Sequence, residues 1–431
     1  MTKRYMLCDL IIKGKYVLPM DDELSIIKDG FVAVSENKIC AVGAGDEIKN
    51  YQAKEIIDAG KAIVMPGLIN CHTHAAMAYF RGLADDLPLN DWLFNHIFPA
   101  EAKFVNEEFV RKSGALSCLE MIKSGTTCFN DMYFFGQEFL AEIVEKAGLR
   151  AVLGLDLKTP GYTVERVVEL AKQFKDNELV KIALAPHSVY VCPRDVLEKV
   201  KQAAGAENLR VHIHVSETKK EVEDCKQARG KTPVEYLDEL GLLAPATMAA
   251  HSVWLDDNDL KIYKDRGVKA AHCPISNMKL ASGAAPLAKM LELEIPVGLG
   301  TDGAASNNTQ DLFMEMRGCA LMHKLASLNP AVVSARQAVK MATIDGAKVL
   351  GREKEIGSLE IGKEADIITI NLNKPHLAPL YDSYSHLVYC AGGSDVENVV
   401  VNGRVIMKNR QVKTLDENKI LREAERFNLQ H

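Results

Sequence analysis

Residues 62–77 read AIVMPGLINCHTHAAM, an apolar run that ends in two histidines, His72 and His74. Residues two apart on a strand point to the same side, so these two imidazoles can face one centre. The pattern returns at residues 210–217, RVHIHVSE, where two more histidines close a second apolar run. An apolar run that ends in polar side chains is typical of a buried strand whose carboxyl end opens on a site.

Runs of this kind recur along the middle of the chain, separated by amphipathic segments. Apolar strands that alternate with helices indicate a parallel sheet with helical crossovers. Eight strands over about 240 residues match a (β/α)8 barrel in count and in size. The eight runs begin at residues 62, 126, 151, 181, 210, 247, 268 and 296.

Two connecting segments can be interpreted in more detail. Residues 106–125 predict a helix, because Asn106 is a good N-cap, acidic residues fill the first turn and Gly125 follows the last apolar position. The first gap between strands spans about 55 residues, longer than most of the others. A long insertion at the carboxyl end of a barrel strand predicts an active-site loop.

Both ends of the chain are rich in short strands rather than helices. At the far end, Asn402 and Gly403 between apolar runs are a strong hairpin signal. Neither end could bury a core alone, so we expect residues 1–61 and 357–431 to form one small β-sandwich together. The barrel is then expected over residues 62–356, which makes the fold class α/β.

Composition excludes several classes of function. A net charge of -6 with scattered basic residues argues against a nucleic-acid partner. The ten cysteines form no C-x-x-C pair, which argues against a zinc ribbon or a disulfide framework. No apolar run approaches the roughly 18 residues that a membrane span needs. We therefore expect a cytoplasmic protein that does not bind membranes; assembly into a homo-oligomer stays open.

Polar residues at the predicted strand ends favour a metal site. His72 and His74 can share one ion, the pair at His212 and His214 repeats their spacing, and Asp302 adds a carboxylate. Imidazole and carboxylate suit zinc or iron(II) in a catalytic site. The alternative interpretation is a set of partly exposed strand histidines without an ion.

Glu217 lies three residues beyond His214, where a carboxylate could reach a water bound to such an ion. It is a candidate general acid/base, or else a solvated glutamate at the start of the next helix. His187 and His251 are single histidines at strand ends, and their position makes both candidate site residues. For His272 a role behind the site and simple packing are equally compatible with the sequence.

Several motifs resemble those of the amidohydrolase superfamily, and within it those of the 5-methylthioadenosine/S-adenosylhomocysteine deaminase family. The resemblance covers nearly the whole chain. H-x-H is shared by many branches of the superfamily, whereas LADDLPLNDWL followed by Glu101 is more specific. The motifs are residues 65–104 from MPGLINCHTH to EAKF, HIHVSET, AAHSVWLDD, CPISNMKLASGAAP, GLGTDGAASNN and GSLEIGKEADI.

The resemblance implies hydrolytic deamination of the adenine 6-amino group of a 5'-substituted adenosine, a small-molecule nucleoside substrate. It implies that Glu217 shuttles protons, that His251 polarises the attacking water, and that Asp302 also holds and deprotonates this water. His187 stands where binuclear members carry a modified lysine, which favours a single divalent ion, zinc in preference to iron. The implied metal ligands are His72, His74, His214 and Asp302.

On the substrate side, the resemblance implies that Glu101 accepts hydrogen bonds from the ribose hydroxyls. His187 and Arg150 match further substrate contacts, and Trp92 matches an aromatic wall of the pocket or packs within the loop. Some family members carry a second arginine about a dozen residues later, for a homocysteine carboxylate. Here that stretch reads LKTPGYTVER, with Tyr162 near the place and Lys158 or Arg166 as substitutes.

This departure leaves S-adenosylhomocysteine, methylthioadenosine, 5'-deoxyadenosine and adenosine open as substrates. The alternative enzyme is another amidohydrolase, such as a guanine deaminase or a triazine chlorohydrolase, which would not need a ribose-binding acid. A metal-free relative that serves as an interaction module is the remaining alternative, and it is disfavoured because the chain keeps every implied ligand.

Overall fold

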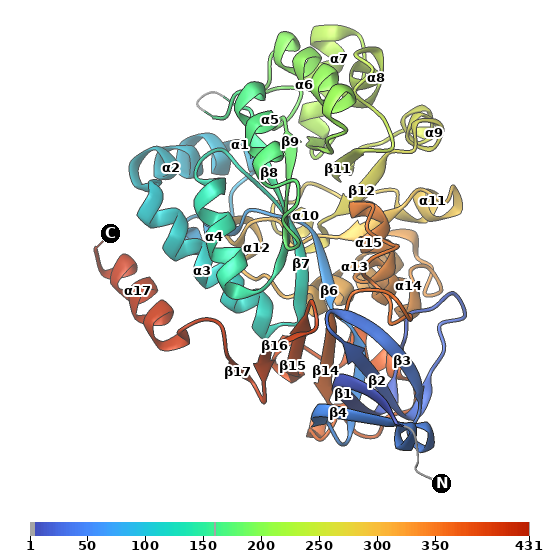
Figure 1. Cartoon of the computed structure of the whole chain (residues 1–431). Coiled ribbons are helices and arrows are strands. Elements are labelled where there is room, and N and C mark those ends of the chain that lie inside the picture. Colours follow the sequence, from blue (N-terminus) through green and yellow to red (C-terminus); the bar gives the residue numbers. More distant parts are fainter. Residues whose placement is uncertain (1–4, 159–160, 431) are drawn as a thin grey trace.

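A barrel of parallel strands forms the larger part of the protein, and a second sheet lies beneath it (Figure 1). The computed structural model describes residues 5–158 and 161–430. Within them, eight strands pair in parallel with their chain neighbours, as expected for a (β/α)8 barrel. These strands are β6 (Leu68–Thr73), β7 (Thr126–Tyr133), β8 (Arg150–Asp156), β9 (Val180–Ala185), β10 (Val211–Val215), β11 (Thr247–His251), β12 (Lys269–His272) and β13 (Val297–Leu299).

The first and last barrel strands meet where the chain leaves β13. The backbone N–H of Asp302 donates to the carbonyl oxygen of His72 at 2.9 Å, so the end of the eighth strand is tied to the end of the first. Side chains at the carboxyl ends of all eight strands therefore face the same end of the barrel.

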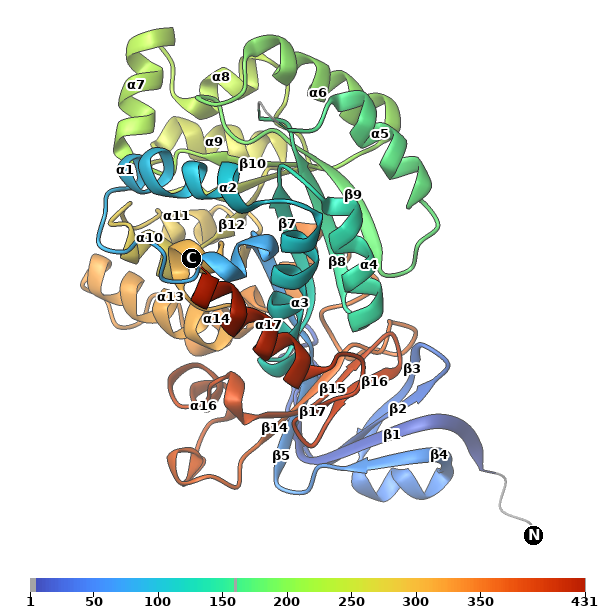
Figure 2. The same ribbon diagram turned by 90° about the vertical axis from the view of Figure 1, so that its left-hand side faces the viewer.

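Helices surround this barrel (Figure 2). Apolar side chains on their inner faces, such as Leu140, Val167 and Leu197, are buried against the strands. No helix in the described residues is long and apolar enough to cross a membrane. The helices that follow the strands are α4 (Gln137–Ala147), α5 (Val164–Gln173), α6 (Arg194–Glu207), α7 (Lys219–Arg229), α8 (Pro233–Glu239), α9 (Asp257–Arg266), α10 (Pro274–Lys279), α11 (Leu287–Glu292), α12 (Ala304–Asn307), α13 (Leu312–Ser327), α14 (Ala335–Met341) and α15 (Ile344–Leu350).

The long connection between β6 and β7 carries several helical segments. The predicted helix at its end is confirmed: Asn106 caps α3, and its side chain accepts a hydrogen bond from the Phe109 N–H at 3.0 Å. The segments in order are η2 (Ala75–Phe80), α1 (Leu89–Asp91), η3 (Trp92–Ile97), α2 (Phe98–Phe104) and α3 (Glu107–Lys123).

Strands from both chain ends combine in the second sheet, as the sequence predicted. Over the described residues they form one hydrogen-bonded sheet of nine strands, in which β5 pairs with β1 on one side and with β14 on the other. Its strands are β1 (Met6–Val17), β2 (Ile27–Ser35), β3 (Lys38–Ala44), β4 (Tyr51–Asp58), β5 (Ala62–Pro66), β14 (Ile367–Asn371), β15 (Val396–Val401), β16 (Arg404–Lys408) and β17 (Gln411–Val412).

The remaining elements of this C-terminal part are η4 (Pro375–Leu377), α16 (Ser383–Tyr389), η5 (Gly393–Asp395) and α17 (Glu417–Gln430), and η1 (Gly45–Asn50) lies between β3 and β4. Helix α17 returns to pack along α3, as Figure 2 shows.

The first apolar run of the sequence divides between the two sheets. Residues 62–66 form β5 of the small sheet, and only residues 68–73 form the first barrel strand. The chain therefore passes from the small sheet to the barrel at Gly67. An added Cβ at Gly67 would lie 2.1 Å from Oγ1 of Thr127, so the chain can pass between the sheets only with glycine there.

Arg150 joins the barrel to the small sheet. It begins β8 at the amino-terminal end of the barrel and is fully buried. Its Nε donates to Oδ2 of Asp366 at 2.8 Å, Nη2 donates to Oδ1 of Asn402 at 2.9 Å, and the guanidinium also pairs with Glu364. Asp366 in turn accepts a hydrogen bond from the Asn402 N–H at 2.8 Å.

We predict that Arg150→Met lowers the free energy of unfolding by about 3–5 kcal/mol, because Asp366 is left as a buried, unpaired carboxylate. Denaturant unfolding followed by circular dichroism measures this loss. Arg266→Met is the matched control, since that guanidinium pairs with Asp238 at the surface and its removal should change stability much less. Equal unfolding midpoints for the two variants would contradict the role of Arg150 as a buried ion-pair partner that joins the two sheets.

Candidate metal centre and active-site cavity

A cavity opens at the carboxyl ends of the barrel strands. The long first connection forms one wall, which agrees with its interpretation as an active-site loop. From this connection come Leu89, Trp92, Leu93, Phe98 and Glu101. The other lining residues are His74, Met77, Met132, Tyr133, Asp156, Lys158, His187, Tyr190, His214, Glu217, His251, Leu280 and Asp302.

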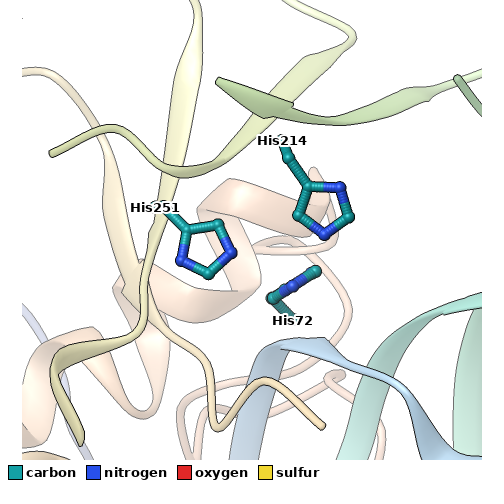
Figure 3. A group of neighbouring side chains, drawn as sticks. All are labelled: His72, His214 and His251. Atoms are coloured by element: carbon teal, nitrogen blue, oxygen red, sulfur yellow. The ribbon is translucent and has the colours of Figure 1, made fainter. Parts of the chain in front are cut away.

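Histidines from several strands converge at the floor of the cavity. His72, His214 and His251 point toward one another from β6, β10 and β11 (Figure 3), and their nearest ring nitrogens lie within 4.8 Å of one another. His74 joins from just after β6: its Nε2 lies 3.2 Å from Oδ1 of Asp302, and Nε2 of His72 lies 3.4 Å from the same oxygen. The predicted ligand positions are thus brought together, with His251 beside them.

Hydrogen bonds on the far side of each ring fix its orientation. Nδ1 of His74 lies 2.6 Å from the carbonyl oxygen of Met132, and Nδ1 of His214 lies 2.8 Å from that of His187. When these Nδ1 atoms carry the proton, Nε2 presents a lone pair to the centre, as in metal-binding histidines.

One buried nitrogen supports the fit to a metal ion. Within the described residues, the fully buried Nε2 of His72 makes no hydrogen bond of good geometry, and the acceptor Oδ1 of Asp302 lies 3.4 Å away. Buried polar atoms are nearly always satisfied, so an unpartnered one needs an explanation. A divalent ion among these histidines and Asp302 would give this nitrogen a partner, and the donor set of imidazoles and one carboxylate suits such an ion.

Asp302 keeps its negative charge although it is buried. Burial alone would raise the pKa of its carboxyl, but the neighbouring His72 and His74 hold that pKa well below its usual range. Its Oδ2 accepts hydrogen bonds from the hydroxyls of Ser276 and Ser306, at 2.6 and 2.7 Å. These partners hold the carboxylate in one orientation.

Glu217 has the opposite electrostatic character. Burial raises the pKa of its carboxyl above the usual value, so it can hold a proton more readily than an exposed glutamate. Its Oε2 lies 3.8 Å from Nε2 of His251. The preceding Ser216 has a left-handed backbone with φ of 51°, and Glu221 accepts the N–H groups of Ser216 and Glu217 at 3.1 and 2.7 Å. Glu217 is therefore a buried cavity residue and not a solvated one.

The other side of the cavity holds the carboxyl group of Glu101, which is only 4% exposed. Its Oε2 accepts a hydrogen bond from Nζ of Lys158 at 3.0 Å. The same ammonium lies 4.2 Å from the ring centre of Phe98 and 4.4 Å from that of Phe134. The side chains of Glu101 and Lys158 are therefore hydrogen-bonded to each other at this wall, next to two aromatic rings.

Trp92 and His187 also line the cavity. Trp92 is buried, and in the described residues its indole Nε1 has no hydrogen-bond partner. The His187 ring lies 4.7 Å from that of His214, and burial lowers its pKa well below the usual value, which keeps it neutral. Both side chains are placed where they could contact a bound molecule.

Three other candidates lie outside this site. Arg150 lies at the opposite end of the barrel and does not line the cavity, so the expected substrate contact is wrong. Its guanidinium instead joins the barrel to the small sheet through Asp366. Arg166 is part-exposed and pairs with Glu169 and Glu138 on the surface. His272 does not line the cavity, and its Nε2 lies 2.9 Å from Nε2 of His323.

Sequence reasoning missed the residues that support the site from behind. Oδ1 of Asn277 accepts a hydrogen bond from Nδ1 of His251 at 3.0 Å, and the Ser276 hydroxyl donates to Asp302. The signals for them were their place directly after the seventh strand and their presence in the motif CPISNMKLASGAAP. Glu221 carried no signal, because its partners are backbone N–H groups.

A family model described as "Amidohydrolase family" matches residues 63–406. A 5-methylthioadenosine/S-adenosylhomocysteine deaminase of Thermodesulfovibrio yellowstonii is 46% identical, over 96% of this chain and 97% of the relative. A 5'-deoxyadenosine deaminase of Methanosarcina mazei is also 46% identical, over 97% of this chain and 98% of the relative.

Among solved structures, an adenosine deaminase from Xanthomonas campestris with bound zinc superposes with a TM-score of 0.95 at 34% identity, over 99% of both chains. Fold, strand-end histidines and full-length similarity agree with the resemblance seen in the motifs. The chain therefore belongs to the amidohydrolase family, in the branch that holds the two deaminases just named.

Proposed function

We propose that this protein hydrolyses the adenine 6-amino group of 5'-substituted adenosines, giving the inosine analogue and ammonia. The observation that carries the proposal is that one cavity holds the histidine and carboxylate cluster on one side and the buried Glu101 on the other. The cluster suits hydrolysis at a ring carbon, and Glu101 suits hydrogen bonding to the hydroxyls of a ribose. The names of the similar deaminases support the same reaction.

His72, His74, His214 and Asp302 are the proposed ligands of a single divalent ion, zinc in preference to iron. Imidazole and carboxylate are the ligands of catalytic zinc sites, which keep one position for water or substrate. When bound, such an ion makes water a nucleophile near neutral pH. His251 is not assigned as a ligand because its Nε2 also faces Glu217. In this position His251 can polarise the attacking water.

Glu217 is the proposed proton carrier. Water adds to the ring carbon that bears the amino group, and Glu217 takes a proton from this water and passes it to the adjacent ring nitrogen. It then moves a second proton to the amino group, which leaves as ammonia. A carboxyl whose pKa is raised by burial suits both directions of transfer. Asp302, which stays ionised, holds the water and accepts a hydrogen bond from it.

Glu101 is the proposed acceptor for the ribose hydroxyls, with Trp92 and His187 as further contacts. Lys158 is then the cation nearest to the ribose, and it is already paired with Glu101 and covered by two aromatic rings. A carboxylate on the 5' substituent would have to compete with Glu101 for this ammonium. Met132 and Tyr133 give the neighbouring wall an apolar surface that suits a small 5' group.

We predict that His72→Ala loses most of its bound metal, because His72 contributes to both overlapping ligand groups. Elemental analysis of purified protein measures the metal per chain. His376→Ala is the control, since that histidine belongs to the C-terminal part and pairs with Asp395. Full occupancy in His72→Ala would overturn the ligand assignment.

We predict that Glu217→Gln lowers kcat by at least about 10²-fold, the usual scale for a positioned acid/base, and leaves the metal content unchanged. Ammonia release from adenosine derivatives measures the rate. Glu223→Gln, an exposed change on helix α7, which follows Glu217 in the chain, should retain full activity. Near-normal turnover in Glu217→Gln would transfer the proton-carrying role to another group, with Asp302 as the first choice.

We predict that methylthioadenosine and 5'-deoxyadenosine are turned over at least as well as S-adenosylhomocysteine, judged by kcat/KM. The reason is that Arg150 lies outside the cavity and Lys158 is committed to Glu101. A desolvated carboxylate without a free cation loses binding energy. Kinetics with the three substrates on wild type and on Lys158→Met test this.

The opposite result is equally specific. A strong preference for S-adenosylhomocysteine that disappears in Lys158→Met would show that Lys158 holds the carboxylate. Glu101→Ala should weaken all ribosides together, because each loses the same hydroxyl contacts.

A further inference from the structure

Tyr133 carries a hydroxyl that the protein itself leaves unused. It is the last residue of β7, is 3% exposed and lines the cavity. Its ring belongs to the apolar wall next to the 5' group, but its hydroxyl is polar. Within the described residues this buried hydroxyl makes no hydrogen bond of good geometry. A buried hydroxyl without a partner costs free energy, so a ligand that pairs with it is a physical reason for its presence.

Glu101 lies close to this hydroxyl. Burial and, after it, the negative charge of Glu101 raise the pKa of the Tyr133 hydroxyl well above its usual value, so the group keeps its proton and can donate it in a hydrogen bond. The Glu101 carboxylate already accepts a hydrogen bond from Lys158 at 3.0 Å. An unused donor and a carboxylate therefore lie together at the wall that we propose for the ribose.

The backbone on both sides of this wall is fixed by the barrel. The carbonyl oxygen of Met132, which precedes Tyr133, lies 2.6 Å from Nδ1 of His74. Tyr133 itself is paired in register with Leu155 of β8, from which the chain continues to Lys158. Tyr133 is thus held on a strand between the histidine cluster and Glu101. Groups held on strands are placed more precisely than groups on loops, which suits recognition of one part of a ligand.

The chemistry of a ribose completes the argument, which rests on the proposed function. Each ribose hydroxyl is both a donor and an acceptor, like any hydroxyl. When its hydrogen points to Glu101 in a closed cavity, its oxygen still needs a donor. We propose that the Tyr133 hydroxyl donates to the oxygen of a ribose hydroxyl whose hydrogen Glu101 accepts, and that Tyr133 thereby selects ribosides over deoxyribosides. Sites that hydrogen-bond a substrate hydroxyl reject analogues without it.

Tyr133→Phe tests the proposal, because it removes only the hydroxyl. The substrates are 5'-deoxyadenosine and its two analogues that lack the 2' or the 3' hydroxyl. We expect kcat/KM for 5'-deoxyadenosine to fall about 3- to 10-fold, the scale of one neutral hydrogen bond. The loss should appear mainly in KM, because the contact is the same in the ground state and the transition state. For the analogue without the contacted hydroxyl, variant and wild type should be equal.

Tyr79→Phe is the matched control. Within the described residues the Tyr79 hydroxyl is also buried without a hydrogen-bond partner, but Tyr79 does not line the cavity. We expect this variant to process all three substrates like wild type. Neither variant should have a lower melting temperature, because neither hydroxyl loses a partner within the protein. A clearly lower melting temperature for Tyr133→Phe would show a structural hydrogen bond and overturn the proposal.

The kinetic comparison has two further outcomes that would overturn it. These are an unchanged kcat/KM for 5'-deoxyadenosine in Tyr133→Phe, and an equal loss for all three substrates, which would place the contact away from the ribose hydroxyls. Where an analogue reacts too slowly, its inhibition constant against 5'-deoxyadenosine gives the same comparison. Failure of the proposed function is distinguishable, because folded wild type would then release no ammonia from 5'-deoxyadenosine.

Discussion

The backbone N–H of Asp302 donates to the carbonyl oxygen of His72, and the carboxylate of the same residue faces the rings of His72 and His74. The contact that joins the last barrel strand to the first therefore also places the charged group of the site among its histidines. Asp302 adopts a left-handed backbone, with φ of 61°, to make both contacts at once. Strained backbone of this kind persists only where the surrounding structure imposes it.

Two buried carboxyls in this cavity differ in charge because their neighbours differ. Burial acts on both in the same direction. Asp302 lies against two imidazoles, which lower its pKa, and it also accepts hydroxyl and N–H hydrogen bonds. Glu217 meets one imidazole at a longer distance, so its pKa stays raised. One group is thereby suited to hold a charge and the other to carry a proton.

Much of this arrangement could be predicted from periodicity. Apolar runs that end in H-x-H or in TDG indicate strands, and they show at which end of each strand the polar side chains lie. The barrel and the cluster of histidines with Asp302 could both be inferred from this pattern. The division at Gly67 could not be predicted, because β5 and β6 are both buried and read as one apolar run broken only by Pro66 and Gly67. The position of Arg150 at the start of its strand already indicated the far end of the barrel. Its partner Asp366 lies too far along the chain for any local pattern to reveal.

The place of β5 between β1 and β14 has a consequence for biosynthesis. Its partner on one side, β1, is made before it, but its partner on the other side, β14, is made about 300 residues later. At about 5–20 residues per second, the ribosome needs roughly 15–60 s to reach that strand. During this interval one edge of β5 has no partner strand, and its side chains are apolar on both faces. An unpaired apolar edge of this kind can pair with strands of other chains. The edge of β5 therefore stays open until after the last barrel strand has been made.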